Sequence, residues 1–488
     1  MVKTGKRLQL AAITLFIFNG FLYSQGYSIK LKAPDFAGKD VILAEYFTSR
    51  MVPKDTIQLN SKGAGAFSGN TSFDGGLYVI FFDSRHYFDF LLDKNQHISI
   101  FADSSDLVGK TVFRDSEINT EFYRYKLNVA EKRKEQQSLL DQLAVARNKS
   151  DSSLIQSNMD ELNKGMENYI EEITLKNKDN FFGTFLLAMK ENNAPESIVS
   201  GTPLQQDSIR YVYYRQHYFD NFDIGDIRLL HTPLYDPKIK TYINRVATQY
   251  PDSLIVAVDK LLKASRAHDE MFRYMLITLF NNFAESKMMG MDKVYFHIAE
   301  KYYIPEATWS DAAFIEKLKD NLEKSKYTFI GNPAPDFELR GIPVEHFQMA
   351  EMDEDIKKDP HVGFPFKVSQ VGARYTILYF WEADCGHCQK STPKLYEVFE
   401  KYKNQDVKVL AVHVINSVEG KEKWIDFVNQ HEMYDWVNCW SPYDNEFRKM
   451  YNLQSFPQLF LLDENKKILA KNLSPEQVDD ILNRFINN

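Results

Sequence analysis

The stretch YTILYFWEADCGHCQKSTPKL, residues 375–395, carries the strongest structural and chemical signal in the chain. Its first part, residues 375–381, is apolar and rich in aromatic residues, which is typical of a buried strand. Pro393 and the residues after it suit a helix, so Cys385 and Cys388 fall where a strand ends and a helix begins. The partial positive charge of a helix N-terminus favours a thiolate on Cys385. One helical turn brings Cys388 close enough to form a disulfide, and the pattern predicts a redox-active pair.

Composition limits the other function classes. The chain has 488 residues, enough for about three domains, and a formal net charge of −8, which gives no indication of nucleic acid or an anionic membrane surface as a partner. It has three cysteines, the third being Cys439, for which we expect a buried, inert thiol. This count excludes a disulfide framework and a four-cysteine zinc site. We therefore predict no metal and no cofactor; zinc held by Cys385, Cys388 and two distant ligands is the alternative.

The N-terminus has the pattern of a secretory signal peptide. Three basic residues, Lys3, Lys6 and Arg7, precede an apolar run over residues 8–22. We predict a signal peptide over residues 1–26 and an exported protein of the periplasm or cell envelope, where disulfide chemistry has substrates. An uncleaved N-terminal anchor is the alternative.

The rest of the chain predicts a multidomain protein. Residues 27–112 contain short alternating runs separated by turns, which predict a β-sandwich-like domain. Residues 113–328 are charged with apolar residues at three- and four-residue spacing, and predict an all-α domain. A cluster of His217 and three aspartates, the last Asp226, could ligate a metal, but helix capping and turns are the better interpretation.

The last domain, residues 329–488, alternates strands and helices and predicts an α/β layer fold. Pro333 and Pro335 mark its start. The expected strands cover residues 376–381, 407–415, 436–440, 458–462 and 468–471. The expected helices cover residues 386–402, 420–431 and 444–451, and a final one opens at residues 474–477.

These residues together resemble the thioredoxin superfamily. The resemblance is carried by Phe380-Trp381, the run from Cys385 to Cys388, Pro393, and Phe456-Pro457 before a strand. The segment that opens the domain, residues 331–337, is similar to the exported thioredoxin-like branch that includes the TlpA and ResA proteins. The resemblance covers residues 331–488. The upstream segments resemble the uncharacterised N-terminal domains that accompany such modules in exported proteins of Bacteroidetes, which implies architecture but no chemistry.

The resemblance implies a role for each matching position. Cys385 would be the attacking thiolate and Cys388 the resolving thiol. Pro457 would be cis and face the disulfide, turning the backbone of Phe456 toward a substrate peptide. Trp381, Gly386 and His387 would support the motif, and a charged or hydrogen-bonding His387 would stabilise the thiolate and make the disulfide more oxidising.

Two positions depart from the family pattern. Many members carry an acid six residues before the first cysteine, where this chain has Tyr379. In the ResA-like branch a glutamate follows the second cysteine by three residues, where this chain has Ser391. Either acid would assist proton transfer at the second cysteine, so the proton acceptor for Cys388 is unassigned. We expect Glu382 and Asp384 to point into a loop, and we expect Asp384, directly before the nucleophile, to oppose the thiolate.

The sequence thus predicts a thiol-disulfide oxidoreductase that acts on exported proteins through Cys385 and Cys388. Its partners would be protein thiols and disulfides, with a membrane electron donor if it works as a reductant. Reduction, oxidation and isomerisation stay open as directions. The alternative is a binding or scaffold protein of the cell envelope, whose N-terminal domains recognise a partner or form a homodimer, with the redox module accessory.

Overall fold

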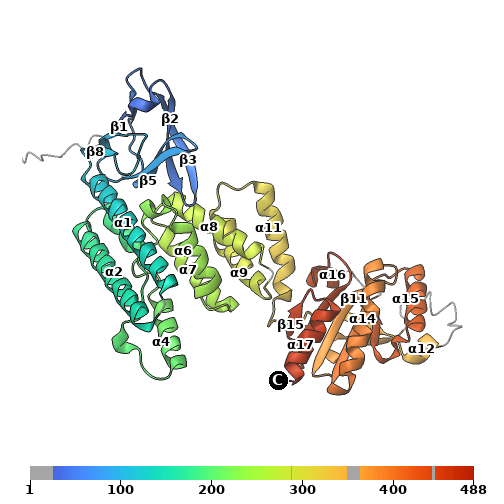
Figure 1. Cartoon of the computed structure of the whole chain (residues 1–488). Coiled ribbons are helices and arrows are strands. Elements are labelled where there is room, and N and C mark those ends of the chain that lie inside the picture. The colour runs from blue at the N-terminus through green and yellow to red at the C-terminus, as the bar shows by residue number, and fades with distance from the viewer. Residues whose placement is uncertain (1–25, 147, 287, 349–362, 442–445, 488) are drawn as a thin grey trace, which may run out of the picture. The chain divides into compact units, whose positions relative to one another are not determined.

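The computed structural model describes residues 26–146, 148–286, 288–348, 363–441 and 446–487 (Figure 1). The predicted signal peptide lies outside this range. The chain forms two compact units, Met1–Val246 and Ala247–Asn488. No helix among the described residues is long and apolar enough to cross a membrane.

The first unit begins with two four-stranded sheets. Their strand orders are β4-β1-β7-β8 and β3-β2-β5-β6. Fully buried side chains from both sheets, such as Ile29, Phe67, Val79 and Phe90, form the core, as alternation along the strands predicts. The expected strand-rich N-terminal part is confirmed. The bounds are β1 (Tyr27–Lys32), β2 (Asp40–Phe47), β3 (Arg50–Gln58), β4 (Ala64–Gly69), β5 (Gly76–Asp83), β6 (His86–Leu92), β7 (His97–Phe101) and β8 (Val112–Arg114).

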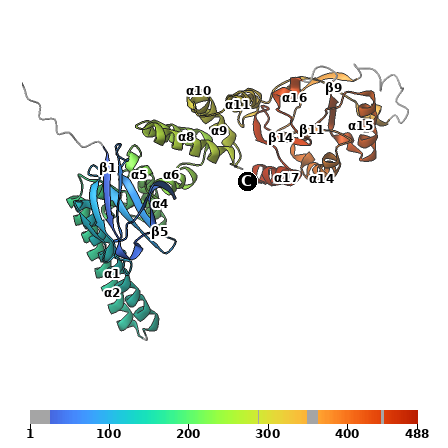
Figure 2. The ribbon, with the colours of Figure 1, turned by 90° about the horizontal axis from the view of Figure 1, so that it is seen from above.

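Helices follow the sheets in the first unit. The two longest, α1 (Glu117–Val145) and α2 (Lys149–Lys176), lie side by side as a hairpin (Figure 2). Asn148 caps α2 by accepting a hydrogen bond from the Asp151 N–H. The other helices are α3 (Phe181–Met189), α4 (Pro203–Gln216), α5 (Ile227–Leu230) and α6 (Tyr235–Thr241), and α6 continues into a π-helical turn, Tyr242–Val246.

Amphipathic helices open the second unit. Leu254, Val258 and Leu261 are buried, at the four- and three-residue spacing that places them on one helix face. These helices are α7 (Pro251–Ser265), α8 (Asp269–Ala284), α9 (Met291–Ile298), α10 (Ile304–Glu306) and α11 (Ala312–Ser325), with a π-helical turn at Ala299–Tyr303. The predicted helical middle part is therefore confirmed.

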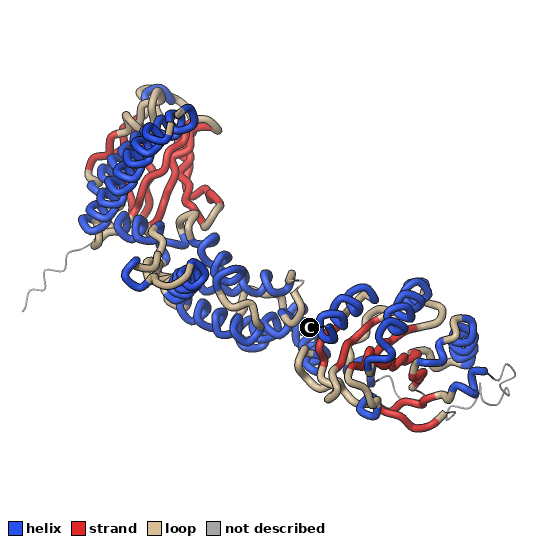
Figure 3. The backbone as a smooth tube through the Cα atoms, turned by 60° about the horizontal axis from the view of Figure 1, so that its bottom comes forward, coloured by secondary structure: helices blue, strands red, loops and turns tan. Residues whose placement is uncertain are grey.

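The second unit ends in a seven-stranded mixed sheet (Figure 3). Its order is β10-β9-β13-β12-β11-β14-β15, in which β11, β12 and β13 run parallel and the other pairs are antiparallel. The strands are β9 (Glu338–Gly341), β10 (Phe364–Lys367), β11 (Tyr375–Trp381), β12 (Val407–His413), β13 (Val437–Trp440), β14 (Gln458–Leu462) and β15 (Ile468–Lys471).

Helices cover both faces of this sheet. Alternate residues of β11 point to opposite sides, and all of them are buried, so both faces must be covered. Ile377 and Tyr379 join one core cluster with α14 (Gly386–Tyr402), α15 (Val418–Gln430) and α17 (Pro475–Asn487). Leu378 and Phe380 join the other with residues of α16 (Glu446–Met450) and Tyr451. A short helix, α12 (Val344–Gln348), also contacts α15. The predicted α/β layer fold is confirmed.

Candidate active site

Cys385 and Cys388 lie at the start of α14, directly after β11 and its loop. Cys385 is the N-cap residue, and its Sγ accepts a hydrogen bond from the Cys388 N–H at 3.3 Å. Both cysteines carry free thiols, and Cys385 is half-buried whereas Cys388 is fully buried. An accessible sulfur therefore stands in front of an enclosed one, which is the order that attack followed by internal resolution needs.

The environment of Cys388 disfavours its thiolate. Burial, together with its hydrogen bond to Cys385, raises the pKa of Cys388 far above the ordinary thiol value. A backbone hydrogen bond from Glu382 lowers that pKa and opposes the rise. The second sulfur thus depends on the loop before the motif for help in ionising.

The loop from Glu382 to Asp384 is held by several contacts. The Cys385 N–H donates to the Glu382 carbonyl at 3.3 Å. Asp384 forms an ion pair with Lys423 of α15, with 2.7 Å between carboxylate oxygen and Nζ. The negative charge beside Cys385 is therefore paired rather than free, a contact that the sequence did not reveal.

The Phe456–Pro457 peptide bond is cis, as the resemblance implied. The Cys385 thiol donates a hydrogen bond to the Phe456 carbonyl at 3.4 Å. The guanidinium of Arg448 lies 5.3 Å from the centre of the Phe456 ring and donates to the Val414 carbonyl at 2.7 Å. The segment before the proline therefore touches the sulfur to which a substrate would bond.

Tyr379, at the position where the resemblance implied an acid, is fully buried. Its hydroxyl lies 2.7 Å from Thr392 Oγ1, which donates to the Cys388 carbonyl at 2.8 Å. Burial raises the pKa of Tyr379 well above the ordinary phenol value, and interactions with both cysteines add to the rise. A neutral phenol of this kind is no base for Cys388.

The three supporting positions differ in exposure. Gly386 and His387 are exposed on the first turn of α14, and open space surrounds the position that a Cβ on Gly386 would occupy. Trp381 is fully buried and packs on the rings of Phe427, at 5.1 Å, and His413, at 5.6 Å.

Cys439 is fully buried in the core cluster on the other face of the sheet, and burial raises its pKa strongly.

His413 is a residue that sequence reasoning missed. It ends β12, is 1% exposed, and its Nε2 accepts a hydrogen bond from the Ala383 N–H at 3.4 Å. In sequence it is one residue of an apolar strand, Val407–His413. Its place beside the dithiol becomes visible only from the pairing of β11 with β12. That parallel register sets His413 opposite Trp381, two residues before Ala383.

The carboxylates near His217 have structural roles, as we expected. His217 Nδ1 lies 2.6 Å from Asp220, Asp223 accepts from the Gly225 N–H, and Asp226 caps α5. Asp223 and Asp226 thus serve a turn and a helix start.

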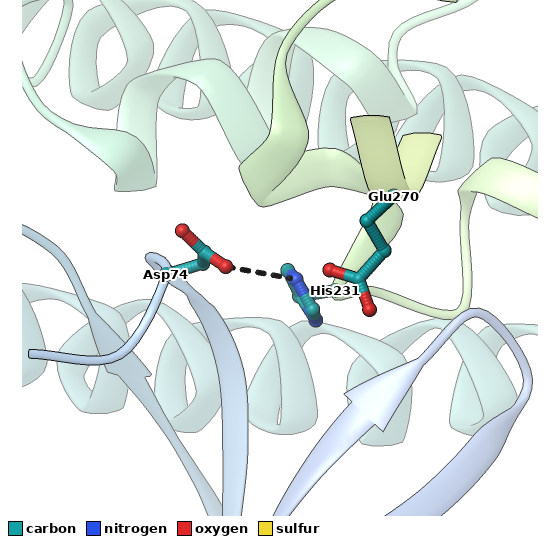
Figure 4. A group of neighbouring side chains, drawn as sticks. All are labelled: Asp74, His231 and Glu270. Carbon is teal, nitrogen blue, oxygen red and sulfur yellow. Dashed lines mark ion pairs between the residues drawn. The ribbon is translucent and has the colours of Figure 1, made fainter. Parts of the chain in front are cut away.

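A buried polar group lies elsewhere in the first unit. His231 is 2% exposed, with Nε2 3.8 Å from Asp74 (Figure 4) and Nδ1 3.7 Å from Glu45. Glu45 also forms a 2.7 Å ion pair with Lys54. The two carboxylates flank opposite nitrogens of the imidazole, which gives the buried ring a polar neighbour on each side.

Comparison with known proteins agrees with this geometry. A family model described as thioredoxin-like matches residues 372–468. The C-terminal part of this chain is a thioredoxin-like domain, related to thiol-disulfide oxidoreductases of the ResA type. A second model, a domain of unknown function (DUF5106), matches residues 156–328.

Among the relatives of the thioredoxin-like domain is the thiol-disulfide oxidoreductase ResA of Oceanobacillus iheyensis. It is 24% identical over 159 residues, which are 32% of this chain and 69% of the relative. A solved thioredoxin-like protein from Bacteroides caccae is 17% identical with a TM-score of 0.39, over 60% of this chain and 97% of that one. A thiol:disulfide interchange protein from Bacteroides sp. is 20% identical with a TM-score of 0.26, over 33% and 93%.

Proposed function

We propose that the protein exchanges dithiols and disulfides with exported proteins through Cys385 and Cys388. The observation that carries this proposal is the half-buried Cys385 sulfur at the start of α14, backed by a buried Cys388 and touching the Phe456 carbonyl. The helix N-terminus stabilises negative charge on a sulfur placed there. The relation to thiol-disulfide oxidoreductases supports the same chemistry.

The exchange proceeds in two balanced steps. The Cys385 thiolate attacks one sulfur of a substrate disulfide, a mixed disulfide forms, and the other substrate sulfur leaves as a thiolate that takes up a proton. Cys388 then loses its proton and attacks Cys385 Sγ, so the Cys385–Cys388 bond forms and the substrate leaves fully reduced. Two electrons pass from the protein to the substrate. The reverse sequence oxidises a substrate dithiol.

Insulin reduction by dithiothreitol, or refolding of a reduced protein, tests the proposal. Cys385→Ser is expected to abolish the activity because it removes the attacking sulfur, whereas Cys439→Ser is expected to keep it. Unchanged activity in Cys385→Ser would sink the proposal. The reduction potential of the pair assigns the direction, since a value near that of thioredoxin favours reduction and one near protein disulfide isomerase favours oxidation or isomerisation.

We also propose that the protein works in the periplasm or cell envelope. The basic residues and apolar run at the N-terminus support cleavage of a signal peptide near residues 24–26. N-terminal sequencing of the protein isolated from cells should begin near residue 27; a start at Met1 would contradict cleavage. A reductive role would require a membrane electron donor.

The proposed domains are residues 27–112, 113–328 and 329–488. We propose, as a second role, that the N-terminal domains bind a partner or a second copy of the chain; residues 156–328 match a family model of their own, a domain of unknown function. The double variant Cys385→Ser/Cys388→Ser separates the two roles. Partner binding or dimerisation that survives in this variant supports recognition by residues 27–328, and its loss assigns the interaction to the cysteines.

A further inference from the structure

His413 is enclosed beside the dithiol. Its ring stacks on Trp424 of α15, with centroids 5.3 Å apart and an interplanar angle of 5°, and meets the edge of Trp381 of β11 at 5.6 Å. Its Nε2 accepts from the Ala383 N–H. An imidazolium carries hydrogens on both nitrogens and cannot accept, so this contact needs the neutral ring.

The surroundings keep that ring neutral. Burial lowers the pKa of His413 to about 3, and a backbone hydrogen bond with Ile415 and the charge of Asp384 offset this only in part. The carboxylate of Asp384 is itself paired with Lys423. His413 therefore acts as an acceptor throughout the pH range in which thiols react.

The backbone of Ala383, which His413 holds, is fixed from both sides. While the Ala383 N–H donates to His413 Nε2, the Ala383 carbonyl accepts from Gln389 Nε2 at 3.0 Å. The preceding residue, Glu382, provides the backbone hydrogen bond that lowers the pKa of Cys388. Because only a donor stabilises a thiolate, that group on Glu382 is its N–H.

We propose that His413 is a positioning residue of the dithiol site, which holds the backbone of Ala383 so that the Glu382 N–H meets the Cys388 sulfur. The inference rests on the proposed function, in which Cys388 is the resolving thiol. It assigns His413 to the second step, the attack of Cys388 on Cys385 Sγ with release of the substrate thiolate. The first step uses the Cys385 sulfur, whose hydrogen bonds are with the Cys388 N–H and the Phe456 carbonyl.

The two steps can be timed separately with oxidised glutathione. The reduced full-length protein is mixed with it, quenched in acid and analysed by mass spectrometry, which resolves the reduced, glutathionylated and disulfide forms. In His413→Phe, which keeps an aromatic ring between the tryptophans but no acceptor, formation of the mixed disulfide should keep its wild-type rate. Its resolution at neutral pH should slow by about tenfold, the value of one hydrogen bond to a charged group, and the pH profile of that step should move up by about one unit.

Three variants complete the experiment. His413→Gln offers an acceptor oxygen and should recover most of the resolution rate. Gln389→Leu, on the surface of α14, removes the hydrogen bond to the Ala383 carbonyl and should also slow resolution. The test therefore does not depend on how well His413→Phe folds. His431→Phe, at the half-buried C-cap of α15, should leave both steps unchanged.

The outcomes separate the inference from the proposed function. Resolution that is unaffected in both His413→Phe and Gln389→Leu would overturn the inference, as would equal slowing of both steps, which indicates a merely structural role. A wild-type protein that forms no mixed disulfide would refute the proposed function, and the inference with it.

Discussion

Protonation of His413 should make the stability of the second unit depend on pH. The folded protein keeps this imidazole neutral down to about pH 3, whereas the ordinary histidine pKa is 6.5. Below 6.5 the unfolded chain binds a proton that the folded chain does not, so stability rises with pH in this window. The contribution is fully present above 6.5 and is lost progressively as the pH falls from 6.5 toward 3.

The size of the effect follows from the two pKa values. Each pH unit below 6.5 lowers the free energy of unfolding by about 1.4 kcal/mol. Between pH 7.5 and pH 5, His413 should therefore lower it by about 2 kcal/mol. His413→Phe cannot titrate. The fall in stability over that range should therefore be about 2 kcal/mol smaller in the variant than in the wild type, since the other titrating groups cancel in the comparison.

Urea unfolding followed by tryptophan fluorescence provides the assay. Four of the five tryptophans, Trp381, Trp424, Trp436 and Trp440, lie in the thioredoxin-like domain, so the signal reports on that domain. His413→Gln also cannot titrate, so it should show the same reduced dependence on pH as His413→Phe. Parallel pH dependences in wild type and His413→Phe would refute the argument.

Three further predictions concern the core and the charges near the dithiol. Ile377→Ala should lower the free energy of unfolding by about 2–5 kcal/mol in urea titrations, because this fully buried side chain leaves a cavity; a loss below 1 kcal/mol would contradict the packing of β11. Cys439→Ala should leave the rate of exchange with glutathione unchanged, because the thiol is fully buried on the other face of the sheet; a slower rate would indicate a third redox sulfur. Lys423→Met should leave the urea midpoint unchanged, because its ion pair with Asp384 is exposed; a clear shift would contradict that interpretation.

The sequence predicted the elements whose pattern is local. The apolar run of β11 and the apolar spacing of α14 depend only on residues within each element. Both elements are found at the predicted places, with Cys385 as the N-cap of α14 and Cys388 in its first turn. Strands β9 and β10 were not predicted. Each has four residues, too few for an alternating pattern to stand out from a loop, and they form by pairing with each other and, for β9, with β13.

The contacts around the dithiol could not be predicted for a similar reason. His413 meets Ala383 because β12 lies parallel to β11, a pairing between residues about thirty positions apart. Lys423 meets Asp384 because α15 begins beside the same loop. We expected Asp384 to point into a loop and to oppose the thiolate. Its ion pair with Lys423 offsets the negative charge that would oppose the thiolate.

Trapping of substrates on the dithiol tests the central claim most directly. Cys388→Ala removes the resolving sulfur, so the mixed disulfide on Cys385 cannot be released by internal attack. The full-length variant, isolated from cells under acid quench, should carry exported proteins in complexes that dithiothreitol dissolves, and Cys385→Ser/Cys388→Ala should carry none. Equal complexes in both variants, or none in Cys388→Ala, would contradict exchange through Cys385.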